Sequence, residues 1–122
     1  MINGDNPGDY LGSVSLSSDG TKLAVGAPNK GGNNGQVVIY NWDGSAWNPL
    51  GSEINGASSN EFFGSTVHLS ANGERLAIGA RESTNLGGAA TAGHVGVYDW
   101  NGTDWDLVGD KIEGVNQADG EN

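Results

Sequence analysis

One stretch of sequence occurs twice in this chain, and its repetition constrains the fold more than any other feature. Residues 14–28 read VSLSSDGTKLAVGAP, and residues 67–81 read VHLSANGERLAIGAR. In each copy apolar residues alternate with polar ones, reach an Asp-Gly or Asn-Gly pair, and alternate again. This pattern predicts a β-hairpin, and the dipeptide favours a type I′ turn because both of its positions tolerate positive φ.

The repeat extends beyond the hairpin, because each copy is followed by two further segments with a strand pattern. In the first unit, strands are expected at about residues 12–17, 21–26, 36–42 and 46–51. The second unit places its strand residues in the same order: Val67 and Leu69, Leu76 and Ile78, Val95 with Val97 and Tyr98, and Trp105 with Val108. A period of about 50 residues with several strands per unit is typical of β-propeller blades.

We therefore predict an all-β fold of antiparallel four-stranded blades, two blades of a propeller that is larger or built from several copies. Blade one is expected at residues 9–60 and blade two at 61–118, between the end of a preceding repeat at 1–8 and the start of a following one at 119–122. A blade buries its faces only against neighbouring blades, so two blades leave two apolar faces open. The expected partners are further blades of the same chain or other copies of it.

The two units differ in two places. Residues 63–67 carry one residue more than residues 11–14, and an odd insertion turns the following side chains to the wrong face unless a β-bulge absorbs it. The loop at residues 82–92 is longer than its counterpart at 29–34 and rich in glycine and alanine, and we expect it to be a tolerated insertion.

Composition excludes several partners. Fifteen acidic residues against five basic ones give a formal net charge of -10, which disfavours nucleic acid and anionic membranes. No stretch approaches the roughly 18 apolar residues of a membrane span, so no membrane insertion is expected. The chain has no cysteine, so it needs no disulfides, a condition compatible with secretion.

Short motifs connect the repeat to a known family. Residues 63–67 and 76–80 read FGSTV and LAIGA, and residues 11–14 and 23–28 read LGSV and LAVGAP. These segments resemble the FG-GAP repeat, the blade of integrin α-subunit propellers and of many secreted microbial and algal proteins. The segments YNWDGSAW and YDWNGTDW, which begin at Tyr40 and Tyr98, look like its tryptophan-rich variant. The resemblance implies a β-propeller that is secreted or at the cell surface.

The chain departs from this family where many members bind calcium. In place of an Asp-rich loop it has only Asp19-Gly20 and Asn72-Gly73, whereas calcium needs about 6–8 oxygen ligands. We therefore expect no metal site and no cofactor here, and any calcium site of such a propeller to lie elsewhere in the full-length protein. Leu11 also replaces the motif's Phe, and Arg81 replaces its Pro.

The four tryptophans are candidate ligand-stacking residues. They form two matched pairs, Trp42 with Trp47 and Trp100 with Trp105, each flanking a turn. Each pair is expected to make a cross-strand contact, which stabilises a hairpin by roughly 0.2–1 kcal/mol. Packing within the blade is the favoured interpretation because the pair recurs in each unit, and a sugar-stacking platform is the alternative.

The remaining polar candidates are interpreted as surface groups. His68 and His94 have no second ligand at metal spacing and are expected to be ordinary surface histidines. A solvated acidic face is favoured over weak calcium binding for the cluster Asp99, Asp104, Asp106 and Asp110. Asn101 begins an Asn-Gly-Thr sequon, a possible glycosylation site in a secreted eukaryotic protein.

These residues form no catalytic constellation, so a non-enzymatic function is predicted. The leading hypothesis is a structural or adhesion module at the cell surface or outside the cell, which presents loops on a rigid ring to a protein or matrix ligand. Carbohydrate binding through the tryptophans is the second hypothesis. A non-catalytic accessory domain of a secreted enzyme is the third.

Overall fold

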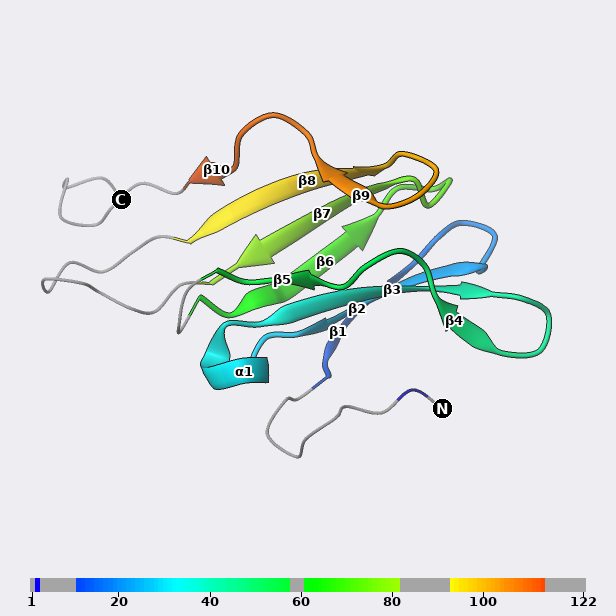
Figure 1. Ribbon diagram of the computed structural model, residues 1–122, viewed down its shortest axis with the longest axis horizontal. Helices are drawn as coiled ribbons and strands as arrows, with labels where there is room; N and C mark the ends of the chain where they lie inside the picture. The colour runs from blue at the N-terminus through cyan, green and yellow to red at the C-terminus, as the bar shows by residue number, and fades with distance from the viewer. Residues whose placement is uncertain (1, 3–10, 58–60, 82–92, 114–122) are drawn as a thin grey trace, which may run out of the picture.

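The computed structural model describes residues 2, 11–57, 61–81 and 93–113, and the structural statements below concern those residues. They form two antiparallel β-sheets, so the all-β prediction is confirmed (Figure 1). The first sheet contains β1 (Ser13–Leu16), β2 (Lys22–Ala27), β3 (Gln36–Trp42), β4 (Trp47–Pro49) and β5 (Ile54–Asn55). The second contains β6 (Phe63–Leu69), β7 (Arg75–Ala80), β8 (His94–Trp100), β9 (Trp105–Leu107) and β10 (Ile112–Glu113). The short α1 (Lys30–Asn33) is an irregular turn in which Gly31 and Gly32 have positive φ.

The two sheets share one topology, with order β1-β2-β3-β4 in the first and β6-β7-β8-β9 in the second. Each sheet nevertheless has five strands, so the expectation of four is wrong in detail. The outer strand is divided: β4 pairs with the end of β3, and β5 pairs with its start, Val37 opposite Ile54. Gly51 lies between the two pieces with φ +78, a left-handed conformation that interrupts a strand. Gly109, with φ +67, lies at the same place in the second sheet.

The hairpin turns differ from the predicted type I′. Among residues 17–21, all of which the structure describes, Gly20 is the one residue with positive φ, and its N–H donates to the carbonyl of Ser17. The Asp19 side chain accepts from the N–H of Thr21 and stabilises this longer turn. Gly73 and Asn72 repeat the arrangement between β6 and β7.

A β-bulge lies where the second unit carries its extra residue. Phe63 lies opposite Ala80, but the next pair is Thr66 with Gly79, so Gly64 and Ser65 are the extra residues of the bulge. Gly64 absorbs the irregularity with φ +89. Beyond the bulge, the side chains of β6 regain the same alternation as those of β1.

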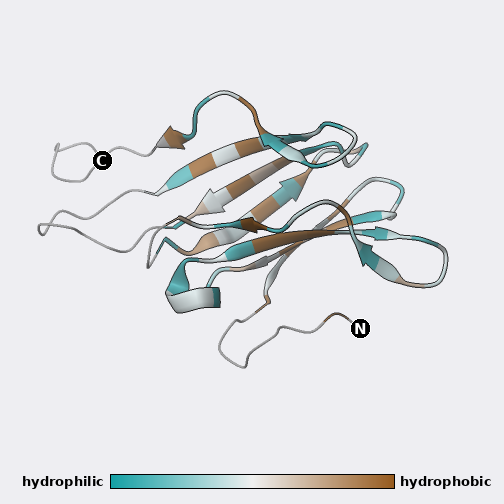
Figure 2. Ribbon diagram, in the orientation of Figure 1, coloured by the Kyte–Doolittle hydropathy of each residue, from teal (hydrophilic) through white to brown (hydrophobic). Residues whose placement is uncertain are grey.

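One face of each sheet packs against the other sheet and forms the core. The first sheet contributes Ala24 from β2 and Val37 with Ile39 from β3, all completely or almost completely buried. The second sheet contributes Phe63, Leu69, Leu76, Ile78, Ala80, Tyr98 and Trp105. The hydropathy colouring shows apolar and polar residues alternating along these strands, as expected for sheets with one face in a core (Figure 2).

The packed faces are not equivalent faces of the repeat. Leu69 packs inward from the second sheet, whereas its counterpart Leu16 lies on the outer face of the first sheet and is 57% exposed. Val14, which shares the face of Leu16 as predicted, is 62% exposed. The second sheet therefore covers the opposite face of the first sheet, and β1 exposes Val14 and Leu16 on the face that corresponds to the core side of the second sheet.

Glycines allow the two sheets to approach closely. A Cβ atom on Gly26 would overlap the carbonyl oxygen of Gly64 across the interface. A Cβ atom on Gly35 would overlap the backbone of Phe63, where the chain enters β6, and one on Gly56 would overlap the backbone of Asn34. The N–H groups of Phe62 and Phe63 donate to the carbonyls of Asn33 and Asn34 and join the sheets there.

This close approach predicts an asymmetry between two equivalent glycines. Gly26→Ala is expected to lower the free energy of unfolding by about 1–3 kcal/mol, because the added methyl group meets backbone atoms that cannot move aside separately. Gly79→Ala is the matched control. Its methyl group meets the rotatable side chain of Thr66, so a smaller loss is expected. Denaturant unfolding of both variants measures the difference, and equal losses would contradict the proposed approach of Gly26 to Gly64.

Candidate binding surface

The turns of both sheets gather along one edge of the molecule, here called the turn edge, which comprises residues 17–21, 43–46, 70–74 and 101–104 (Figure 1). Hydrogen bonds between the sheets fix its shape. The N–H of Ser18 donates to the carbonyl of Ala71 at 2.8 Å, and that of Ser52 donates to Oδ1 of Asp104 at 2.9 Å. Acidic groups on or beside the edge are Asp19, Asp43, Glu74, Asp99, Asp104 and Asp106.

The tryptophan pairs make the predicted cross-strand contacts. Trp42 lies opposite Trp47, with ring centroids 5.3 Å apart and planes tilted by 53°. Trp100 lies opposite Trp105 with almost the same geometry, 5.4 Å and 54°. Tilted rings at this separation interact favourably beyond the area that they bury, so packing within each hairpin is confirmed.

The environments of the two pairs differ. Trp105 is 8% exposed, because the segment after β4 covers it and the carbonyl of Leu50 accepts from its indole N–H at 3.2 Å. Trp42, in the pair that no other sheet covers among the described residues, is 39% exposed. Trp47 and Trp100 are partly buried, so Trp42 is the most exposed of the four rings. Ligand stacking stays a prediction for all four.

A shallow polar hollow of about 360 Å³ lies beside Trp100 on the turn edge. Its lining residues are Ser70, Asn72, Glu74, Arg75, Asp99 and Trp100. Arg75 binds Asp99 through two parallel hydrogen bonds, Nε to Oδ1 at 2.6 Å and Nη2 to Oδ2 at 2.7 Å. The pair lowers the pKa of Asp99 and raises that of Arg75. The hollow thus combines an aromatic wall with groups able to hydrogen-bond hydroxyls.

Two aspartates on the turn edge hold the turns through backbone hydrogen bonds. Oδ1 of Asp43 accepts from the N–H groups of Ser45 and Ala46, both at 2.8 Å. Chiefly because of these bonds, the pKa of Asp43 falls to about 2. Asp19 accepts from the N–H and hydroxyl of Thr21, and its pKa also falls to about 2. In the second unit Asn101 and Asn72 take the same places and accept equivalent bonds.

The aspartates of the last hairpin each have a separate partner. Asp99 binds Arg75, Asp104 accepts from Ser52, and Asp106 accepts from Asn101 at 2.7 Å. Among the described residues, no three carboxylate or imidazole groups are arranged to hold a metal ion. The Asn101 side-chain nitrogen, which would carry a glycan, is thus the donor to Asp106, and its glycosylation stays a prediction.

The expectation of a surface position for His94 is wrong, whereas His68 is exposed as expected. The side chains of His94 and Glu61 are 7% and 2% exposed, with Nε2 of the imidazole 2.9 Å from Oε2 of the carboxylate. Oε1 of Glu61 accepts from the N–H of Ala57 at 2.7 Å. Burial raises the pKa of the nearby Tyr98, and the charge of Glu61 adds to the rise.

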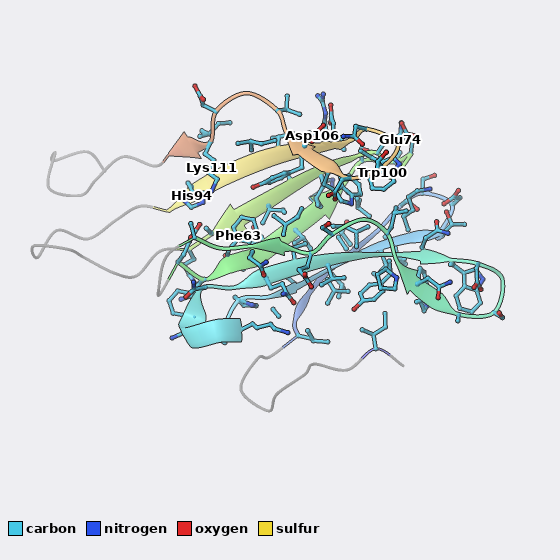
Figure 3. The ribbon with its side chains drawn as sticks, in the orientation of Figure 1. Phe63, Glu74, His94, Trp100, Asp106 and Lys111 are labelled. Atoms are coloured by element: carbon cyan, nitrogen blue, oxygen red, sulfur yellow. The ribbon has the colours of Figure 1, made fainter. Side chains whose placement is uncertain are left out.

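The Glu61–His94 pair lies away from the turn edge, as Figure 3 shows for His94 at one end of the second sheet and Glu74, Trp100 and Asp106 at the other. The first unit has Gln36 at the place of His94, so the repeat contains no signal for this pair. Its position where the chain crosses to the second sheet indicates a structural role.

Comparison with protein-family models and with curated protein sequences finds no match to this chain. Within the described residues, no helix has the length and apolar character to cross a membrane. The likeness to FG-GAP repeats therefore remains a prediction from the motifs quoted above.

The buried pair predicts a strong effect of His94. His94→Ala is expected to lower the free energy of unfolding by about 1–3 kcal/mol, because the buried Glu61 carboxylate loses the imidazole. His94→Gln should lose less, since its amide can still donate. His68→Ala, at an exposed position, should change stability by less than about 0.5 kcal/mol. Denaturant titration checks all three, and a neutral His94→Ala would contradict a structural role for the pair.

The turn aspartates predict an acid-sensitive stability. Their pKa values are lower in the folded chain than the ordinary 3.8, so their stabilisation is present above about pH 4 and is lost as the pH falls toward 2. Asp19→Asn combined with Asp43→Asn introduces the residues of the second unit. We expect this double variant to resemble the wild type at neutral pH and to lose less stability between pH 4 and 2. Thermal unfolding across this range measures the slope, and an unchanged slope would refute the assignment.

Proposed function

We propose that the chain is a non-enzymatic β-propeller module, secreted or at the cell surface, that acts in structure or adhesion by binding a protein or matrix ligand. In this proposal each five-stranded sheet is one blade, with β1 and β6 as the first strands. The FG-GAP-like motifs support it, because they lie at equivalent places in the two sheets.

The observation that carries the proposal is the packing of unlike faces. β6 packs against β1 and β2, so the first strands of the two sheets are neighbours, as they are around a propeller axis. If two sheets packed through equivalent faces, each would cover the matching face of the other, and no further sheet would be needed. Packing through unlike faces instead continues from one unit to the next, which is the principle of repeat architectures.

The turn edge is the favoured ligand surface. Backbone hydrogen bonds and cross-strand tryptophan pairs hold its turns in place, which reduces the conformational entropy lost on binding. Its exposed carboxylates, in a chain with a formal net charge of -10, favour a ligand that presents cationic groups.

Carbohydrate binding is a second candidate, favoured by Trp42 and by the hollow beside Trp100. An exposed indole face suits the apolar face of a pyranose ring. The hollow adds hydrogen-bonding groups from Asn72, Glu74 and Asp99. In this alternative Trp105 has no direct role, because the segment after β4 covers it.

A binding experiment separates the two candidates. The immobilised chain is tested against a panel of matrix proteins and against a glycan array, together with Trp42→Ala and Asp104→Asn variants. We expect saturable binding to a matrix protein that weakens with salt, by roughly tenfold or more per decade of concentration if several charges take part. Glycan binding that Trp42→Ala abolishes would establish the second candidate instead. Absence of binding to both panels would contradict both.

A further inference from the structure

The two outer faces of the molecule correspond to the two sides of its own interface. The outer face of the first sheet carries Val14, Leu16, Leu23 and Tyr40, and the equivalent residues of the second sheet, Val67, Leu69, Leu76 and Tyr98, pack inward. Val14 and Leu16 are more than half exposed. Val25 and Ala27 on the same face are each only 5% exposed, so the face that is core in the second sheet is open in the first along its edge strand β1.

The outer face of the second sheet shows the converse. Val95 and Ile112 pair with each other on this face and are 40% and 65% exposed. Their equivalents in the first sheet are Val37, which is fully buried at the interface, and Ile54, which packs against the core. At these two positions the face matches the surface on which the second sheet sits, and near the turn edge it also carries the Arg75–Asp99 ion pair.

Details that allow the close approach inside the molecule recur on the outer faces. Gly79 is the equivalent of Gly26, which lies against the backbone of Gly64. Gly93, with φ +78, is the equivalent of Gly35, which has φ +89 and lies beside Phe63. Leu11, the counterpart of Phe63, is exposed.

Polar groups on the two faces are also compatible. Inside the molecule the Ser15 hydroxyl accepts from the N–H of Leu69 at 2.9 Å. His68 has the place of Ser15 on the outer face of the second sheet, and its ring offers a nitrogen that can accept in the same way. At the paired positions of β1, β2 and β3 on the outer face of the first sheet, all described, no side chain is charged.

We propose that this chain binds a second copy of itself head to tail, with the outer face of the first sheet of one copy on the outer face of the second sheet of the next. The inference rests on the blade geometry of the proposed function and names the partner of those faces. Such a heterologous contact repeats until it closes a ring or extends a filament. A propeller of roughly 4–8 blades would require about two to four copies.

Complementary variants test this arrangement. Leu16→Asp places a charge on one outer face, and Val95→Asp places one on the other. The wild type should sediment as a small whole number of chains, and each variant alone as a single chain. An equimolar mixture should form a dimer and nothing larger, because each variant retains the face that the other lacks. Leu107→Asp, at an exposed position on neither outer face, is the control and should assemble like the wild type.

A wild type that stays a single chain at all accessible concentrations, or a mixture with no more dimer than either variant alone, would overturn the proposal. Cooperative thermal unfolding of each variant shows that loss of assembly is not loss of fold. If the folded chain does not self-associate but still binds a matrix protein, this inference fails and the proposed function stands.

Discussion

The arrangement of the two sheets depends on the packing of Phe63 between them. Phe63 is completely buried, and the N–H groups of Phe62 and Phe63 donate to the carbonyls of Asn33 and Asn34 in the turn before β3. Burial of such a side chain stabilises a fold by about 1.5–3 kcal/mol, and here the same residue sets the distance between the sheets. Gly35 and Gly56 leave room for the chain at this point, and Gly26 does so for Gly64. Each glycine thus serves tertiary packing as well as local geometry.

Much of the fold could be predicted because the sequence contains two versions of each element. Alternation identified the strands, and spacing paired the tryptophans. Comparison of the units showed that residues 63–67 would need a bulge to keep their side chains on the right faces. The divided outer strand could not be predicted, since strand periodicity does not show that Gly51 and Gly109 adopt positive φ. Nor could the buried Glu61–His94 pair, because it joins segments distant in sequence and the first unit has Gln36 instead of histidine. Periodicity reports faces and turns, but it does not report which face a neighbouring sheet covers.

Equivalent residues in this chain have different environments, and this difference organises any account of its function. Trp42 is 39% exposed, whereas its equivalent Trp100 packs against the core. Leu16 and Leu69 have the same place in their sheets, yet one faces outward and the other lies in the core. The exposure of a residue therefore depends on whether the other sheet covers its face. Binding surfaces are therefore expected at the turn edge and on the outer faces of the two sheets, which no other sheet covers among the described residues.

Contact between unlike faces makes one cooperative unit of the two sheets. Native-state amide hydrogen exchange at increasing denaturant tests it directly, with the Leu16→Asp variant used so that self-association does not contribute. Amides in β2 and β3 are expected to open with the same free energy and denaturant dependence as those in β7 and β8, through global unfolding. Exchange in β2 and β3 through a less costly opening, while β7 and β8 stay protected, would contradict it.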